Sequence, residues 1–396
     1  MARTKSTKPK KNDSHRGHRE GSIFQMSNGV WKGQLQVGFK PDGSRRFITK
    51  KSKDKQAILD WMIENQNNVK NNTFIEPTSL SLEQWLWNWM AVYKLNSVAD
   101  NTYARYLSLI NNHILPEINK IKLKDLTKIQ LQNIYNRIMD KGISYEAMKH
   151  VHTVFNQALQ CAVDENLISQ NCSVGLNKGK KEVTEEVHIF TREQQKRIID
   201  NLPFNPLGVL IRTGIGTGAR LGELLGISWD DIDFENNIIH IRNGLKKNKV
   251  FSEDGKKIIK HYFALGTLKT KKSRRDIPIN EATVSLLRKY KLVQRSFIED
   301  ENVVPEMVFL NSKGNYCDPS KVRKAYKKYL ASIEVPYIKF HALRHTFASR
   351  ILEENVPPKV AQELLGHSTV SITMDIYSHV LPEVKREAME RIKGIV

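Results

Sequence analysis

The chain has 396 residues, which is enough for two to three domains that each bury their own core. Lysine and arginine number 63 against 42 aspartate and glutamate residues, a formal net charge of +21 that favours a polyanion as partner. The three cysteines lack a metal-type spacing, which favours a reduced intracellular protein over a secreted one. No apolar run has membrane length, so we expect no membrane partner.

The first 70 residues are predicted to form a basic tail and a small α+β domain. Residues 1–20 are rich in lysine and arginine and poor in apolar side chains, which predicts a tail that is disordered until it meets phosphate or serves only solubility. Over 21–70, alternating stretches separated by Asn-Gly and Asp-Gly turns predict three strands and then a helix. These elements are expected at 22–26, 31–39, 45–49 and 53–66.

A helical domain is predicted for residues 78–172. Ser81 and Gln84 have the spacing of a capping box at its start. Four apolar stripes at helical spacing follow, and their aromatic residues are interpreted as core residues rather than as a binding surface. The stripes begin at Leu82, Tyr103, Leu131 and Met148. Residues 173–186 contain glycines and a lysine run, which indicates a linker.

The remaining residues, 187–396, are predicted to form a mainly helical domain with a small antiparallel sheet. Thr191 and Gln194 have the capping spacing for its first helix. Strands are expected at 238–241, 262–264 and 276–279, with a lengthened basic hairpin over 246–260. Near the end of the chain, one apolar face of a terminal helix is predicted from Val384, Ala388, Met389 and Ile392.

Residues 341–377 concentrate an arginine, several histidines and a tyrosine. A guanidinium can bind two phosphate oxygens, an imidazole can donate to them or move a proton at neutral pH, and a phenol can act as a covalent nucleophile. His341 and Arg344 are three residues apart, so a helix would point both to one side. A short helix is expected to end at Gly366, a left-handed cap that leaves His367 on a loop. Such a set suits an oxyanion better than a metal.

The same residues have alternative interpretations. His341 and His345 have the spacing of a zinc-binding helix, but Ala342 stands where a zinc metalloprotease needs its glutamate base. Each histidine alone could be structural, and Tyr377 alone could be a core aromatic residue. The glycines of 214–222 are not followed by the Lys-Ser/Thr pair of a phosphate loop, so no nucleotide site is predicted.

Taken together, the motifs resemble those of a known family. The C-terminal signature of the tyrosine recombinases, the integrase family of phages and integrative conjugative elements, is similar to His341-x-x-Arg344-His345, Leu365-Gly366-His367 and Tyr377. The stretch 213–225 is similar to the family's first box, which places a second phosphate-binding arginine at Arg220. The stretch 266–279 resembles the hairpin that carries the family's catalytic lysine. Lys269 is the candidate there, with Lys271 and Lys272 as alternatives.

The resemblance implies a multidomain α+β fold. It assigns residues 21–70 to an arm-type DNA-binding domain with a three-stranded sheet and a helix. It assigns 78–172 to an all-helical, SAM-like domain that binds core-site DNA, joined by the linker 173–186 to the catalytic domain, 187–396. The tail 1–20 precedes them.

The implied function is that of a site-specific DNA recombinase, an integrase that integrates and excises a mobile element. Tyr377 would attack a phosphodiester and form a 3′-phosphotyrosyl intermediate, with no cofactor, metal or ATP. Arg220 and Arg344 would neutralise the non-bridging oxygens, and Lys269 would protonate the leaving 5′-oxygen. His341 would assist proton transfer at the tyrosine and His367 would hydrogen-bond the phosphate, while the role of Glu223 would be to support the arginine pocket.

Two other functions remain as alternatives: a DNA-relaxing enzyme similar to type IB topoisomerases, and a non-catalytic DNA-binding regulator. The expected partners are double-stranded DNA attachment sites, further copies of the chain in a tetramer on DNA, and an excisionase or a DNA-bending host protein. The expected location is the bacterial cytoplasm, in association with the nucleoid.

Overall fold

The computed structural model describes residues 21–39, 42–70, 79–118, 120–181, 188–268, 274–367, 369–370 and 374. The chain divides into two compact units. Unit 1 comprises residues 1–182 and 253–257, and unit 2 comprises residues 183–252 and 258–396. The boundaries of the five segments predicted from the sequence stay a prediction, and the basic tail 1–20 lies outside the described residues.

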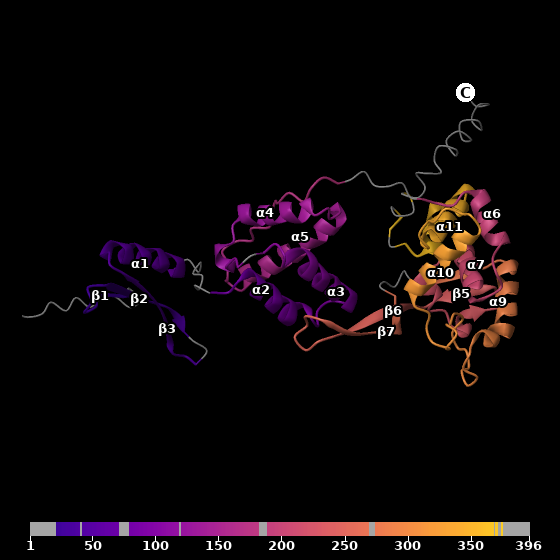
Figure 1. Ribbon diagram of the computed structural model, residues 1–396, viewed down its shortest axis with the longest axis horizontal. Coiled ribbons are helices and arrows are strands. Elements are labelled where there is room, and N and C mark those ends of the chain that lie inside the picture. The colour runs from indigo at the N-terminus through magenta and orange to yellow at the C-terminus, as the bar shows by residue number, and fades with distance from the viewer. Residues whose placement is uncertain are drawn as a thin grey trace, which may run out of the picture. The chain divides into compact units, whose positions relative to one another are not determined.

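Unit 1 begins with a three-stranded antiparallel sheet in the order β1-β2-β3, followed by one helix. The elements are β1 (Ser22–Gln25), β2 (Trp31–Phe39), β3 (Arg45–Ser52) and α1 (Lys55–Lys70). Figure 1 shows α1 lying across the sheet. A Cβ atom on Gly33 of β2 would lie 2.7 Å from Ile58 Cγ2, so glycine there allows the helix to pack closely. The predicted strands and helix are confirmed, although β3 and α1 extend further than expected.

The helical part of unit 1 follows the predicted stripes. It contains α2 (Leu82–Asn88), η1 (Trp89–Lys94), α3 (Asp100–Leu109), η2 (Ile110–Ile114), η3 (Leu123–Asp125), α4 (Lys128–Asp140) and α5 (Tyr145–Asp164). The predicted capping box is confirmed, because Ser81 Oγ accepts from the Gln84 backbone N–H at 3.1 Å and the Gln84 side chain accepts from the Ser81 N–H. Most aromatic residues of these stripes are buried, which confirms their interpretation as core residues, whereas Tyr93 is partly exposed; the buried ones are Trp85, Trp89, Tyr103, Tyr106, Tyr135 and Phe155. The π-helical turns η1 and η2 were not predicted.

Unit 2 is mainly helical around one large apolar core. Its helices are α6 (Arg192–Asp200), α7 (Pro206–Thr217), α8 (Leu221–Leu224), η4 (Trp229–Asp231), α9 (Glu281–Val293), η6 (Gln294–Phe297), α10 (Pro319–Ser332), α11 (Ala342–Glu353) and α12 (Pro358–Leu365). The capping box predicted from Thr191 and Gln194 is confirmed at the start of α6. Figure 1 shows these helices gathered around β5 (Ile238–Ile241).

Within its described residues, unit 2 has two separate sheets rather than the single sheet expected. The strands are β4 (Ile232–Asp233), β5 (Ile238–Ile241), β6 (Asn243–Phe251), β7 (Ile258–Thr267) and β8 (Arg275–Pro278). The first sheet has the order β4-β5-β8, whereas β6 and β7 pair only with each other. The predicted strand 262–264 is therefore part of β7 and does not join the sheet of β5 and β8. The lengthened hairpin expected from the sequence is the β6–β7 pair.

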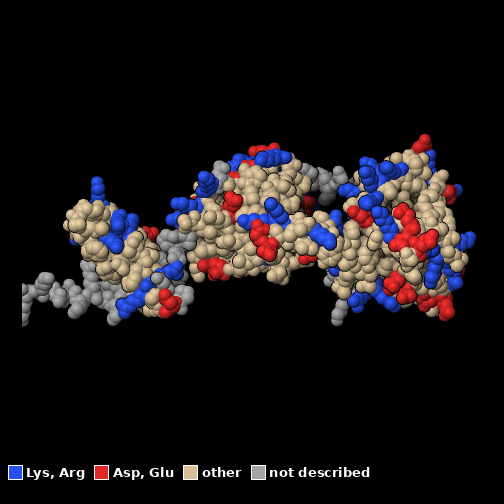
Figure 2. Space-filling model, turned by 60° about the horizontal axis from the view of Figure 1, so that its bottom comes forward, with Lys and Arg blue, Asp and Glu red and all other residues tan. Residues whose placement is uncertain are grey.

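The described surface is strongly charged. Figure 2 shows lysine and arginine side chains over both units, with aspartate and glutamate interspersed. In the part of the chain that the structure describes, every helix is too short or too polar to span a lipid bilayer.

Candidate active site

Three segments of unit 2, far apart in the sequence, bring four of the predicted site residues together. Arg220 stands at the N-cap of α8, His341 at the N-cap of α11, and Arg344 in the first turn of α11. His367 follows the left-handed cap at Gly366, which has φ 66°, so the predicted end of that short helix is confirmed. Lys269 and Tyr377 lie outside the described residues, as do Lys271 and Lys272.

Arg344 is held inside the unit. Its side chain is only 2% exposed, and its Nη1 donates to the Gly218 carbonyl oxygen at 3.0 Å. Gly218 ends α7 with φ 61°, so this left-handed turn aims a carbonyl at the guanidinium and leads the chain toward Arg220. Within the described residues, Arg344 Nη2 has no hydrogen-bond partner. Since a buried guanidinium nitrogen rarely lacks an acceptor, this nitrogen is the clearest place for a bound anion.

Arg220 is fixed by a buried carboxylate. Its Nη1 donates to Glu223 Oε1 at 2.7 Å and its backbone N–H donates to Glu223 Oε2 at 2.9 Å. Glu223 is 4% exposed and also accepts from Arg275 Nη2 at 2.9 Å. Burial would raise the pKa of Glu223, but the charges of Arg275 and Arg220 outweigh burial and lower that pKa. Arg220 itself keeps 39% of its side chain exposed, so its guanidinium is accessible to a ligand.

Positive charge accumulates at this point because three guanidiniums face one carboxylate. Burial, together with the charges of Arg220 and Arg275, lowers the pKa of Arg344 to about 9. Like charges that depress a guanidinium pKa also attract an anion, and the attraction is strongest where water is excluded.

The histidines of the site are neutral near pH 7. Burial and the charge of Arg344 lower the pKa of His367 to about 3. His341 has an exposed edge, yet desolvation by its neighbours and the charges of His345 and Arg344 lower its pKa to about 4. The rings of His341 and His345 pack edge to face, 4.7 Å between centroids. A neutral imidazole has one nitrogen that donates and one that accepts, so each ring can hold or move a proton.

Arg275 was not predicted as a site residue, although it lies within the motif that resembles the lysine hairpin. The period of two along a strand could have found it. Arg275 shares its face of β8 with Ile277, which is fully buried, and the exposed residue Asp276 lies between them.

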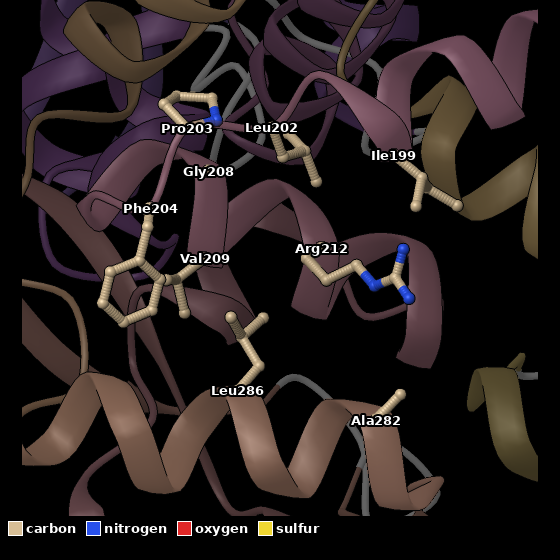
Figure 3. A pocket seen from close by; sticks show the side chains of 9 residues that line it. All are labelled: Ile199, Leu202, Pro203, Phe204, Gly208, Val209, Arg212, Ala282 and Leu286. Atoms are coloured by element: carbon tan, nitrogen blue, oxygen red, sulfur yellow. The ribbon is translucent and has the colours of Figure 1, made fainter.

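A hollow of about 340 Å³ in unit 2 contains none of the predicted site residues. Figure 3 shows its lining from the end of α6, the α6–α7 connection, α7 and α9, with Arg212 as the one charged residue among those shown. This hollow is therefore separate from the arginine and histidine cluster.

Comparison with known proteins identifies the family. Residues 188–383 match the phage integrase family, and residues 81–139 match the N-terminal SAM-like domain of phage integrases. A protein described as tyrosine recombinase XerC-like, from Caldanaerobacter subterraneus subsp. tengcongensis, is 31% identical over 365 residues, which cover 89% of this chain and 92% of that protein. The ICEBs1 integrase of Bacillus subtilis is 24% identical over 396 residues, which cover 95% of this chain and all of that protein, 100%.

Solved structures show the same fold. The Tn1549 transposon integrase in complex with transposon right end DNA superposes with a TM-score of 0.63 at 21% identity, covering 79% of this chain and 99% of that one. A lambda integrase tetramer bound to a Holliday junction gives a TM-score of 0.57 at 17% identity, covering 91% and 96%. The chain belongs to the phage integrase family of tyrosine recombinases. The fold class and the activity predicted from the sequence, site-specific cutting and rejoining of DNA by an integrase, are thereby confirmed.

Proposed function

We propose that Tyr377 attacks a phosphodiester at a DNA attachment site and that the arginine and histidine cluster stabilises the charge that builds on the phosphorus. The tyrosine oxygen forms a bond to phosphorus while the bond to the 5′-oxygen breaks. The products are a 3′-phosphotyrosyl link and a free 5′-hydroxyl, and attack by a 5′-hydroxyl reverses the step. The energy of the broken bond is kept in the protein link, so the exchange integrates or excises a mobile element without a cofactor.

One observation carries this proposal: the buried guanidinium of Arg344 has an unpartnered nitrogen within the described residues, beside the accessible guanidinium of Arg220. Arg344 and Arg220 would each donate to non-bridging oxygens of the scissile phosphate. Donors that are already fixed cost no reorganisation as the transition state forms, which makes this stabilisation large. Burial lowers the pKa of Arg344 most, and the neighbouring positive charges lower it further; the phosphate would relieve this crowding of charge.

The neutral histidines fit two different tasks. His341 would accept or relay the proton of the attacking phenol, a task that needs an unprotonated nitrogen. His367 would donate a hydrogen bond to the phosphate. Its backbone is fixed for this, because the His367 N–H donates to the Gln362 carbonyl oxygen and the Gln362 side chain donates to the His367 carbonyl oxygen, each at 3.1 Å.

The departing 5′-oxygen needs a proton, and we assign that proton to Lys269. Lys269 comes two residues after the end of β7, and β8 begins at Arg275 beside the site. A general acid contributes by stabilising the leaving group, so a substrate with a 5′-thiolate leaving group should need it less.

Exchange between two duplexes cuts four strands, so four copies of Tyr377 must act together. We infer a tetramer of this chain on double-stranded attachment sites in the bacterial cytoplasm, assisted by an excisionase or a DNA-bending host protein. The two DNA-binding domains assigned to 21–70 and 78–172 would choose the sites, which favours recombination over simple relaxation of DNA.

A suicide substrate tests the nucleophile. On a core-site duplex with a nick a short distance 3′ of the scissile phosphate, the short fragment that carries the free 5′-hydroxyl dissociates, so religation fails and the covalent adduct accumulates. The wild-type chain should form an adduct that survives denaturing gels, and Tyr377→Phe should form none while keeping its affinity for DNA. An adduct formed by Tyr377→Phe would show that another residue is the nucleophile.

A further inference from the structure

Arg275, at the start of β8, connects that strand to two of the three segments of the site, α8 and the end of α12. Its side chain is 5% exposed, although arginine is rarely buried without partners. Its Nε donates to the Leu364 carbonyl oxygen at 2.6 Å, and its Nη2 donates to Glu223 Oε2 at 2.9 Å. One guanidinium thus spans two elements that the sequence separates by more than a hundred residues.

The bond to Leu364 fixes the turn that leads into His367. Leu364 lies in the last turn of α12, where backbone carbonyls lack partners within the helix. The chain then turns at Gly366, directly against Arg275. A Cβ atom on Gly366 would lie 3.0 Å from Arg275 Cδ, so the turn packs on the arginine side chain. A displaced Arg275 would therefore release the turn that carries His367.

The bond to Glu223 fixes Arg220. Glu223 uses Oε2 to accept from both Arg275 and the Arg220 backbone N–H, and uses Oε1 to accept from the Arg220 guanidinium. Arg275 also supplies the largest charge effect that keeps the buried carboxylate ionised, since burial alone would raise its pKa. Without Arg275, Glu223 would gain a proton more readily and would hold Arg220 less firmly.

We infer that Arg275 is a positioning residue: it does not touch the DNA but holds Arg220, through Glu223, and His367, through Leu364, in the geometry that the scissile phosphate requires. The inference rests on the proposed function. This role requires a guanidinium, because its planar fork can donate to the Leu364 carbonyl oxygen and to Glu223 Oε2 at the same time. A lysine ammonium is a single point charge without that fork. A merely structural ion pair would stabilise the unit without affecting the charge that the site offers to a phosphate.

The test compares Arg275→Lys with wild type in the suicide-substrate assay at saturating protein. Misplacement of groups at a reacting centre can cost about 10²-fold in rate, so we expect a loss of that order in adduct formation with little change in DNA affinity. The matched control is Arg350→Lys. Arg350 also donates to a side chain and a backbone carbonyl, Gln195 Oε1 at 3.0 Å and the Phe190 oxygen at 2.7 Å, but it contacts no predicted site residue in the described structure. Arg350→Lys should lower the melting temperature yet cleave normally per folded molecule.

A neutral substrate separates positioning from stability. When a methyl group replaces one non-bridging oxygen, the scissile phosphate loses its negative charge. The transition state then carries less negative charge for an arginine to neutralise. If Arg275 acts through Arg220, the ratio of wild-type to Arg275→Lys rates should shrink several-fold on the methylphosphonate. An equal defect on both substrates, or a defect that only follows the loss of folded protein, would overturn the inference.

Glu223→Gln provides a second route if Arg275→Lys does not fold. The loss of cleavage rate in Glu223→Gln should also be smaller on the methylphosphonate. Where both variants fold, the double variant Arg275→Lys with Glu223→Gln should be about as slow as the slower single variant, because both changes break the same chain of contacts. Independent, multiplying defects would contradict the inference. The wild-type chain reports on the proposed function separately: no wild-type adduct rejects that function, whereas a wild-type adduct with normal cleavage by Arg275→Lys rejects the inference alone.

Discussion

Among single residues, His367 shows how the site sets a protonation state. Its ring is 5% exposed and faces the charges of Arg344 and Arg220, so its protonated form is disfavoured. In the unfolded chain His367 binds a proton as the pH falls below 6.5, whereas in the folded chain it stays neutral until the pH approaches 3. At the residue scale, the positive pocket that attracts a phosphate also keeps its histidines neutral.

This protonation state predicts a pH dependence of stability. The pKa of His367 falls from 6.5 unfolded to about 3 folded, so its contribution to stability is complete above pH 6.5 and is lost as the pH falls toward 3. We expect the melting temperature of wild type to drop from pH 7.5 to pH 5, and His367→Asn, which cannot take a proton, to drop less. His188→Asn, on the exposed surface of the same unit, should keep the wild-type slope. Equal slopes for His367→Asn and wild type would contradict the assigned burial.

Local sequence signals predicted much of the site at this scale. His341 and Arg344 were recognisable because they stand three residues apart, and His367 because it follows Leu365-Gly366; the structure brings all three to Arg220. Arg275 was missed because its importance depends on Leu364 and Glu223, which approach it only in three dimensions. These contacts of Arg275 are tertiary, so no spacing of residues along the chain predicts them.

At the scale of elements, the turn from α7 into α8 is the feature on which the site depends. Gly218 has φ 61°, and a Cβ atom there would lie 2.4 Å from Phe347 Cδ1 on α11. The same glycine offers its carbonyl to Arg344. Capping boxes, glycine stops and the β6–β7 hairpin were predicted correctly because they are local. The separation of that hairpin from the sheet of β5 and β8 was not predicted, because strand partners are chosen by tertiary packing.

Substitution of Gly218 should therefore lower the stability of the fold by more than the cost of backbone strain alone. Gly142 also has a left-handed φ of 77°, with nothing within 4 Å of the position of its Cβ, so Gly142→Ala carries only the conformational cost of about 1–2 kcal/mol. Gly218→Ala adds the clash with Phe347 and should lower the melting temperature further, with adduct formation reduced as Arg344 shifts. Equal melting temperatures for the two variants would show that the turn tolerates a side chain.

At the scale of the whole molecule, we propose that the small sheet domain of unit 1 is a separate source of DNA affinity. One face of its sheet is covered by α1, and β3 exposes basic side chains at Arg45, Lys50 and Lys51. A second DNA-binding module on a tether raises the effective concentration of the first at its own site.

Deletion of residues 1–70 should accordingly weaken recombination on substrates that carry distal arm sites far more than cleavage of a minimal core site. The double substitution Lys50→Glu with Lys51→Glu should have the same selective effect without removing the domain, because charge reversal on β3 repels phosphate. The test measures recombination on substrates with arm sites and cleavage of the minimal core site for each variant. Equal losses in both would count against a separate arm-binding domain.

We propose that this chain exchanges strands between two DNA duplexes through four copies of Tyr377. The most direct measurement incubates the purified chain, with the accessory protein that its element requires, with two differently labelled duplexes that each carry an attachment site. We expect recombinant duplexes joined at both strands, formed without ATP and absent with Tyr377→Phe. Relaxation of supercoiled DNA without recombinant product would contradict it and would favour an enzyme that acts like a type IB topoisomerase.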